Sequence, residues 1–201
     1  PLSKELVAAA VATFGCEFFL SYGMTECCGK ISMSLLDQLT VRSLAPHQQL
    51  DLIATSGRPF RPLSVRLMAE GSDVPLSGVG ATGEVQIKGL TVFSGYHGND
   101  KATREAFTAD GWFRTGDVAR QEAFGYLTVC DRLKDMILTG GENVYSVEVE
   151  RVLADHPAVL HACVYGVEND FLGEIVKAVI VLTPEAGGAA SRAAQQTPDG
   201  L

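Results

Sequence analysis

The chain opens with apolar residues at helical spacing, followed at once by a short apolar run. The helical set recurs at intervals of three and four positions: Leu6, Val7, Ala10, Val11 and Phe14. Ser3 and Gly15 are residue types that begin and end helices, so the pattern predicts a helix that ends at Phe14. Residues 16–21 then predict a short buried strand.

Between residues 56 and 129 the helical spacing gives way to short strand-like runs, which turns containing Gly and Pro separate. These runs cover residues 64–68, 83–88 and 127–129. One short helix, expected at residues 101–107, interrupts the series. We therefore expect a mixed α+β chain in which residues 1–55 complete an α/β portion and residues 56–131 form a small, antiparallel, barrel-like β-subdomain.

A second unit follows, with the order strand, helix, strand, strand. Ser146 is a suitable N-cap for its helix, and two β-rich runs cover residues 159–167 and 175–182. This order predicts a partial, small α+β domain over residues 136–183. Residues 184–201 are rich in Ala, Gly and Gln, with almost no large apolar residue, and predict a disordered tail.

Composition limits the partners that the chain can have. A formal charge of −8 argues against nucleic acid or an anionic membrane as the main partner, because both require clustered Lys and Arg. No apolar run approaches the roughly 20 residues of a transmembrane segment. The five cysteines form no zinc-binding pattern, and the simplest interpretation is a soluble protein of a reducing, intracellular compartment.

The most informative motif stands at the end of the first predicted strand, at Tyr22-Gly23-Met24-Thr25-Glu26. A glycine at this place lets another group approach the backbone closely. The threonine hydroxyl can donate to a phosphate oxygen, and the glutamate offers the hard oxygen that Mg²⁺ prefers. The alternative is a simple strand-end turn with a solvated carboxylate.

Two later segments carry similar chemistry. Asp117 follows the aromatic pair Trp112-Phe113 and Gly116, and an anchored carboxylate can accept hydrogen bonds from two neighbouring hydroxyls. Arg132 offers a planar fork of donors suited to ribose oxygens or phosphate. An Asx-type turn at Asp117 and a surface ion pair at Arg132 are the structural alternatives.

In their order and spacing, these three segments resemble the adenylate-forming acyl-CoA ligases and their relatives. The resemblance implies that Thr25 contacts the α-phosphate of ATP, that Glu26 helps to hold Mg²⁺, and that Tyr22 packs along the adenine. It assigns Asp117 to the ribose of ATP or AMP and places Arg132 at the nucleotide.

The resemblance also extends to neighbouring positions. Ser21 and Gly23 fall within the nucleotide-binding motif, and Lys134 falls at the pivot between a large domain, residues 1–131, and a small one. Residues 132–135 would then be a hinge. Gly140 and Gly141 would help to line the path of coenzyme A, although ordinary hairpin chemistry explains a Gly-Gly pair equally well.

A glycine pattern that is typical of dinucleotide-binding folds has a different explanation. Residues 78–83 match G-x-G-x-x-G, but that motif needs a strand before it and the start of a helix after it. Here a strand-like run follows, so we interpret the segment as a loop between strands.

Within the family, Met24 and Lys134 favour the acyl-CoA ligases over peptide-synthetase adenylation domains, and fatty-acid or 4-coumarate ligases are the branch that the chain resembles. Luciferase-like oxidation stays open. The phosphate loop and the terminal lysine of that family are not found, so we expect a C-terminal fragment of an ATP-dependent carboxylic acid–CoA ligase, inactive by itself. The alternative is a non-catalytic fragment that binds nucleotide or docks on a partner.

Overall fold

The computed structural model describes residues 2–37, 43–69, 71–184 and 186. The chain divides into two compact units, residues 1–129 and 130–201, and each is considered by itself. This division falls two residues before the predicted domain boundary, and the hinge at residues 132–135 stays a prediction. Most of the predicted tail, residue 185 and residues 187–201, lies outside the described residues.

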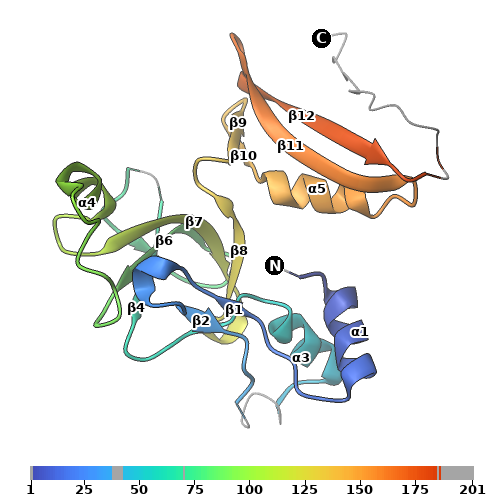
Figure 1. Cartoon of the computed structure of the whole chain (residues 1–201), viewed down its shortest axis with the longest axis horizontal. Coiled ribbons are helices and arrows are strands. Elements are labelled where there is room, and N and C mark those ends of the chain that lie inside the picture. Colours follow the sequence, from blue (N-terminus) through green and yellow to red (C-terminus); the bar gives the residue numbers. More distant parts are fainter. Residues whose placement is uncertain (1, 38–42, 70, 185, 187–201) are drawn as a thin grey trace. The chain divides into compact units, whose positions relative to one another are not determined.

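The first unit begins with the predicted helix. α1 spans Lys4–Phe14, the hydroxyl of Ser3 accepts a hydrogen bond from the Leu6 amide, and Gly15 closes the helix with φ 60°. α3 spans Pro46–Ile53 and contacts α1 (Figure 1), and Lys4 donates to Asp51 across the pair at 2.6 Å. The local capping signals therefore located α1 correctly.

The predicted strand over residues 16–21 is wrong in extent and in burial. Only Ser21–Tyr22 forms a strand, β1, and Phe19 remains 44% exposed. β1 is an edge strand of a small antiparallel sheet with the order β1-β2-β3, in which β2 is Ser32–Met33 and β3 is Arg58–Pro59. The carbonyl of Leu20 accepts the Ser34 amide at 2.9 Å, but within the described residues no strand pairs with residues 16–20, and a ladder needs a paired strand.

The predicted β-subdomain is an antiparallel sheet with the order β5-β4-β6-β7-β8. Its strands are β4 at Ser64–Met68, β5 at Pro75–Leu76, β6 at Thr82–Lys88, β7 at Phe113–Gln121 and β8 at Leu127–Arg132. The sheet is open, not a closed barrel. Residues 77–81 connect β5 to β6, which confirms that the glycine pattern begins as a loop between strands, although its last two residues already belong to β6.

Short helices complete the first unit. α4 spans Asp100–Ala106, as predicted to within one residue, and the side chain of Asn99 caps it. Two 3₁₀ turns, η1 at Thr25–Cys27 and η2 at Ala123–Gly125, follow β1 and β7. The core of the unit gathers residues from η1, from the segment between η1 and β2, and from the larger sheet: Cys27, Ile31, Leu67, Val85, Ile87, Phe113, Ala119 and Leu127.

The second unit is an α+β arrangement, as predicted. Its sheet has the order β10-β9-β12-β11, and the long hairpin of β11 and β12 dominates it (Figure 1). The strands are β9 at Ile137–Thr139, β10 at Glu142–Val144, β11 at Val159–Asn169 and β12 at Gly173–Leu182. α5, Ser146–Ala154, packs on β11, where Glu150 accepts a hydrogen bond from the Val164 amide at 2.8 Å.

Ser146 does not cap α5, contrary to the prediction. The N-cap is Tyr145, and its side chain makes no capping bond. The carboxylate of Asp131 accepts from both the amide and the hydroxyl of Ser146, at 2.6 and 2.8 Å. A carboxylate that lies fifteen positions earlier in the chain thus supplies the acceptor that the start of the helix requires.

Candidate functional site

The predicted nucleotide motif forms a tight turn that the core anchors. Gly23 is required because a Cβ at this position would overlap the backbone carbonyl of Gly29. Thr25 opens η1 with its side chain exposed, and Cys27, two residues later, is buried in the core with 1% exposure. The turn therefore exposes Thr25 on the surface of the unit, while the buried Cys27 anchors the end of η1 in the core.

Tyr22 and Asp117, two of the predicted nucleotide ligands, lie in direct contact. The Tyr22 hydroxyl donates to Oδ2 of Asp117 at 2.6 Å, across 95 positions of sequence. Burial first, and then the hydrogen bond to the Asp117 carboxylate, raise the pKa of Tyr22 far above its usual value. The phenol therefore stays protonated and acts as a donor at any physiological pH.

A second set of bonds fixes the backbone of Asp117 to the sheet. Thr115 donates its hydroxyl to the carbonyl oxygen of Val85 at 2.7 Å and accepts the Asp117 amide at 3.1 Å. Gly116, between them, has φ 72°, a conformation that glycine adopts without strain. Val85 is fully buried in β6, so a core strand determines where the Asp117 backbone lies.

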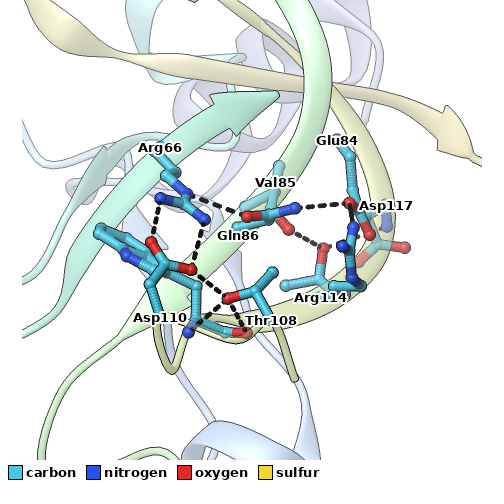
Figure 2. A network of polar contacts seen from close by, with 10 residues as sticks. Arg66, Glu84, Val85, Gln86, Thr108, Asp110, Arg114 and Asp117 are labelled. Atoms are coloured by element: carbon cyan, nitrogen blue, oxygen red, sulfur yellow. Dashed lines mark hydrogen bonds and ion pairs between the residues drawn. The ribbon is translucent and has the colours of Figure 1, made fainter. Parts of the chain in front are cut away.

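Beside Asp117, a network of charged and amide groups (Figure 2) lies on the face of the sheet that points away from the core. Gln86, only 2% exposed, accepts from Arg66 at 2.9 Å and donates to Glu84 at 2.9 Å, and Arg114 pairs with Glu84 at 3.3 Å. Arg66 also forms an ion pair with Asp110 at 2.8 Å. Alternation along β6 sends Glu84 and Gln86 to this polar face and their neighbours to the core.

The Arg66 end of this network includes a stacked ring. The Arg66 guanidinium lies 4.4 Å from the centroid of the Trp112 ring, while Phe113 enters the core with 2% exposure. The two residues of the aromatic pair therefore pack on opposite faces of the sheet, Trp112 against Arg66 and Phe113 in the core. The hydrogen bonds from Arg66 and Thr108 lower the pKa of Asp110 to about 2.

Glu26, the predicted metal ligand, is half-buried and has a partner that the sequence did not suggest. Its Oε1 accepts from the hydroxyl of Tyr96 at 3.1 Å, and its backbone carbonyl accepts from the Phe93 amide at 2.8 Å. Burial and the bond to Glu26 raise the pKa of Tyr96. The segment before α4 thus holds both the side chain and the backbone of Glu26.

The donor set at Glu26 fits a metal ion that arrives with a nucleotide. In the described part of the chain, no group of three or more His, Cys, Asp or Glu residues could hold a metal ion. Mg²⁺ is commonly bound by one or two carboxylates together with phosphate oxygens, and does not need a site built only from protein groups. A single carboxylate beside the exposed hydroxyl of Thr25 matches that arrangement.

The remaining predicted residues lie at other places. Ser21 is exposed in β1 of the first unit. In the second unit, Arg132 is the exposed last residue of β8, and Lys134 is exposed and 3.9 Å from Asp135. The buried Asp131 accepts the Arg132 amide at 2.8 Å, which fixes the backbone of Arg132.

Gly140 and Gly141 form the two-residue turn between β9 and β10. Both have positive φ, 58° and 85°, as a hairpin turn of this length favours. The amide of Gly140 donates to the carbonyl of Leu172, at the tip of the β11–β12 hairpin, at 2.8 Å. Hairpin geometry accounts for both glycines, and their place on a coenzyme A path stays a prediction.

Sequence reasoning missed two residues of the first unit. Thr115 stands inside the segment that was singled out for Asp117, and a Thr two residues before an Asp is a common source of local side-chain to backbone bonds. Tyr96 gave no comparable signal, because 70 positions separate it from Glu26.

Comparison with known proteins identifies two regions. Residues 1–97 match the family model described as AMP-binding enzyme, and residues 148–198 match the one described as AMP-binding enzyme C-terminal domain. A 2-succinylbenzoate–CoA ligase of Bacillus licheniformis is 38% identical over 80% of this chain and 31% of its own length. A long-chain-fatty-acid–CoA ligase of Thermus thermophilus is 40% identical over 83% of this chain and 31% of its own length.

Solved structures agree with these matches. The o-succinylbenzoate coenzyme A synthetase of Bacillus subtilis, solved in complex with ATP and a magnesium ion, superimposes with a TM-score of 0.71 and 32% identity. The match covers 90% of this chain and 34% of the synthetase. The chain thus spans about a third of the length of the relatives that it matches.

Proposed function

Because the chain belongs to the AMP-binding enzymes, we propose that it carries nucleotide-binding residues of an AMP-forming carboxylic acid–CoA ligase. The observation that supports this proposal best is the hydrogen bond between Tyr22 and Asp117. It joins the strand-end motif to the residue assigned to ribose, two segments that the sequence separates widely. ATP, Mg²⁺ and coenzyme A are the ligands that follow from this activity.

The reaction has two steps. A carboxylate oxygen of the substrate bonds to the α-phosphorus of ATP as pyrophosphate leaves, and the thiol of coenzyme A then loses its proton and bonds to the acyl carbon as AMP leaves. Such chemistry depends mainly on the positioning of the reactants and on the neutralisation of charge. Bound Mg²⁺ supplies part of that neutralisation at the phosphates.

Four residues of the first unit have a role in this proposal. Asp117 accepts the ribose hydroxyls, and the ring of Tyr22 packs along the adenine. Thr25 donates its exposed hydroxyl to the α-phosphate, and Glu26 offers a carboxylate oxygen to the metal. In the second unit, Arg132 supplies a cationic donor to the nucleotide.

The other assignments concern motion and the thiol substrate. Lys134 belongs to a hinge that lets the two domains reorient between the two steps. The turn at Gly140 and Gly141 has no side chains beyond hydrogen, so a narrow thiol arm can pass close to its backbone.

The acid substrate is proposed only as a carboxylic acid. One relative is named for an aromatic acid and the other for long-chain fatty acids, so the family does not select between these classes. No helix in the described part of the chain is long and apolar enough to cross a membrane. We assign the protein to an intracellular compartment because it carries five cysteines without a disulfide-type or zinc-type pattern.

Calorimetric titration of the purified chain with AMP, in the absence of metal, tests the adenylate site. We expect saturable binding that Asp117→Ala weakens at least about tenfold, as the loss of a charge-assisted bond to ribose implies. Asp73→Ala is the matched control, because Asp73 is exposed in the loop before β5. A chain that is folded by circular dichroism but fails to bind AMP would contradict the proposal and favour an interaction module.

A further inference from the structure

Tyr96 is held in place from three directions. Its amide donates to the hydroxyl of Thr103 in α4 at 2.9 Å. Its ring lies edge-on to the ring of Phe93, with the centroids 4.8 Å apart, and Phe93 stacks on Phe107 and meets Phe113 of the core. Its hydroxyl donates to Oε1 of Glu26 at 3.1 Å. The side chain is therefore anchored at its base and reaches Glu26 at its tip.

The same segment also holds the backbone of Glu26. The Phe93 amide donates to the carbonyl of Glu26 at 2.8 Å, so the segment that contains Phe93 and Tyr96 contacts Glu26 at two points. Cys27, the next residue, is buried in the core and anchors the backbone at a third point. The backbone of Glu26 is thereby fixed, and the bond from Tyr96 restrains its side chain.

A carboxylate that is held at one oxygen presents the other in a defined direction. Within the described part of the chain, no hydrogen bond or ion pair engages Oε2 of Glu26. Hydrogen bonds from neighbouring groups commonly orient carboxylates that bind metal ions, and their loss typically lowers metal affinity 10- to 100-fold. A phenol suits this role because it donates one proton and adds no competing charge.

We propose that Tyr96 is a positioning residue, which holds Oε1 of Glu26 so that Oε2 faces the magnesium ion that enters with ATP. This inference rests on the proposed function, since it assumes that Glu26 meets a nucleotide-bound metal. It assigns a role to a residue outside the motif segments. Tyr96 acts through Glu26 and does not contact the reacting atoms.

The test measures metal affinity and not turnover. Mn²⁺ serves as the probe: its binding to the full chain in the presence of ATP is followed by electron paramagnetic resonance. Tyr96→Phe removes only the hydroxyl, and we expect it to weaken Mn²⁺ binding about tenfold, the lower end of the range for such partners. Metal-free AMP binding, measured by calorimetry, should remain within about twofold, because no metal takes part.

Two further variants separate positioning from a general structural effect. Glu26→Gln removes the charge that the metal needs, so Tyr96→Phe should cause no further loss in a Glu26→Gln background. Tyr165→Phe, at a tyrosine of the second unit with 44% exposure against 38% for Tyr96, should leave Mn²⁺ binding unchanged.

The outcomes are distinguishable. Wild-type Mn²⁺ affinity in the Tyr96→Phe variant, or additive losses in the double variant, would overturn the role of Tyr96 while the adenylate site stands. The same holds if the wild-type chain binds AMP but gains no Mn²⁺ affinity from ATP. If the wild-type chain does not bind AMP, the proposed function fails, and the role of Tyr96 fails with it.

Discussion

Replacement of Tyr22 by Phe removes one hydroxyl and leaves the ring in place. The lost bond, 2.6 Å to Asp117, has a charged acceptor, and such bonds contribute about 1.5–3 kcal/mol to stability. Tyr126→Phe is the matched control, because the hydroxyl of Tyr126 donates over the same 2.6 Å to the backbone carbonyl of Leu35. A bond between neutral groups contributes only about 0.5–1.5 kcal/mol.

Urea unfolding followed by far-ultraviolet circular dichroism compares the two variants directly. We expect Tyr22→Phe to lower the free energy of unfolding by about 2 kcal/mol and Tyr126→Phe by about 1 kcal/mol, with unchanged denaturant slopes. The reasoning is refuted if Tyr126→Phe costs as much as Tyr22→Phe or more, because the charge on Asp117 would then contribute nothing to the bond.

The same bond predicts a loss of stability in alkali. Burial and Asp117 raise the pKa of Tyr22 in the folded chain, whereas an unfolded tyrosine titrates near its usual value of about 10. The contribution is complete below about pH 10 and declines above it, as the unfolded chain loses a proton that the folded chain keeps. Above about pH 10, the free energy of unfolding should therefore decrease with rising pH more steeply in wild type than in Tyr22→Phe. The two slopes should differ by up to about 1.4 kcal/mol per pH unit.

Three further substitutions test other parts of the structure. Asp131→Ala removes the acceptor at the start of α5, and we expect it to lower the stability of the second unit by about 3 kcal/mol, measured by hydrogen exchange. Asp155→Ala, at the other end of α5, should lower that stability far less. Arg66→Gln should raise the pKa of Asp110 from about 2 toward its usual range, measured by carboxyl NMR shifts. Gly141→Val should lower the melting temperature more than Gly141→Asn, because Asn tolerates the left-handed φ of 85°.

Local signals in the sequence located the helices α1, α4 and α5 and the strands β4, β6, β11 and β12, whereas the helix α3 and the long strand β7 were not predicted. α1 begins after Ser3 and ends at Gly15 because both capping bonds lie within four residues of the helix ends. Residues 16–20 failed as a strand because a strand depends on a partner, and the apolar run carries no information about one. Ser146 failed as a cap because Asp131, an acceptor in β8, binds its hydroxyl and its amide, and two strands separate β8 from α5 along the chain.

The candidate site could be predicted only in pieces. Residues were assigned to it by family resemblance, motif by motif, and the bond between Tyr22 and Asp117 brings two of these motifs together. Tyr96 was missed because neither hydrophobic period nor motif spacing reports a contact between a loop and a turn 70 positions away. Contacts between polar side chains on different loops follow from the sheet that carries the loops, and the sequence patterns do not encode them.

The sheet determines the geometry of the site through a short chain of bonds. The Thr115 hydroxyl donates to the carbonyl of Val85 and accepts the Asp117 amide, and the Asp117 carboxylate accepts a hydrogen bond from the Tyr22 hydroxyl. These bonds fix the backbone of Asp117 before a ligand arrives, so little conformational entropy remains to be lost when a ribose binds.

A substitution at Thr115 should therefore weaken AMP binding, although Thr115 is not assigned a contact with the ligand. Thr115→Val keeps the shape of the side chain and removes both bonds. We expect it to lower the affinity for AMP about tenfold, measured by calorimetry. Thr128→Val, on the neighbouring strand β8, is the matched control. An equal loss of AMP affinity in the two variants would mean that the effect comes from the sheet as a whole and not from the bonds that hold Asp117.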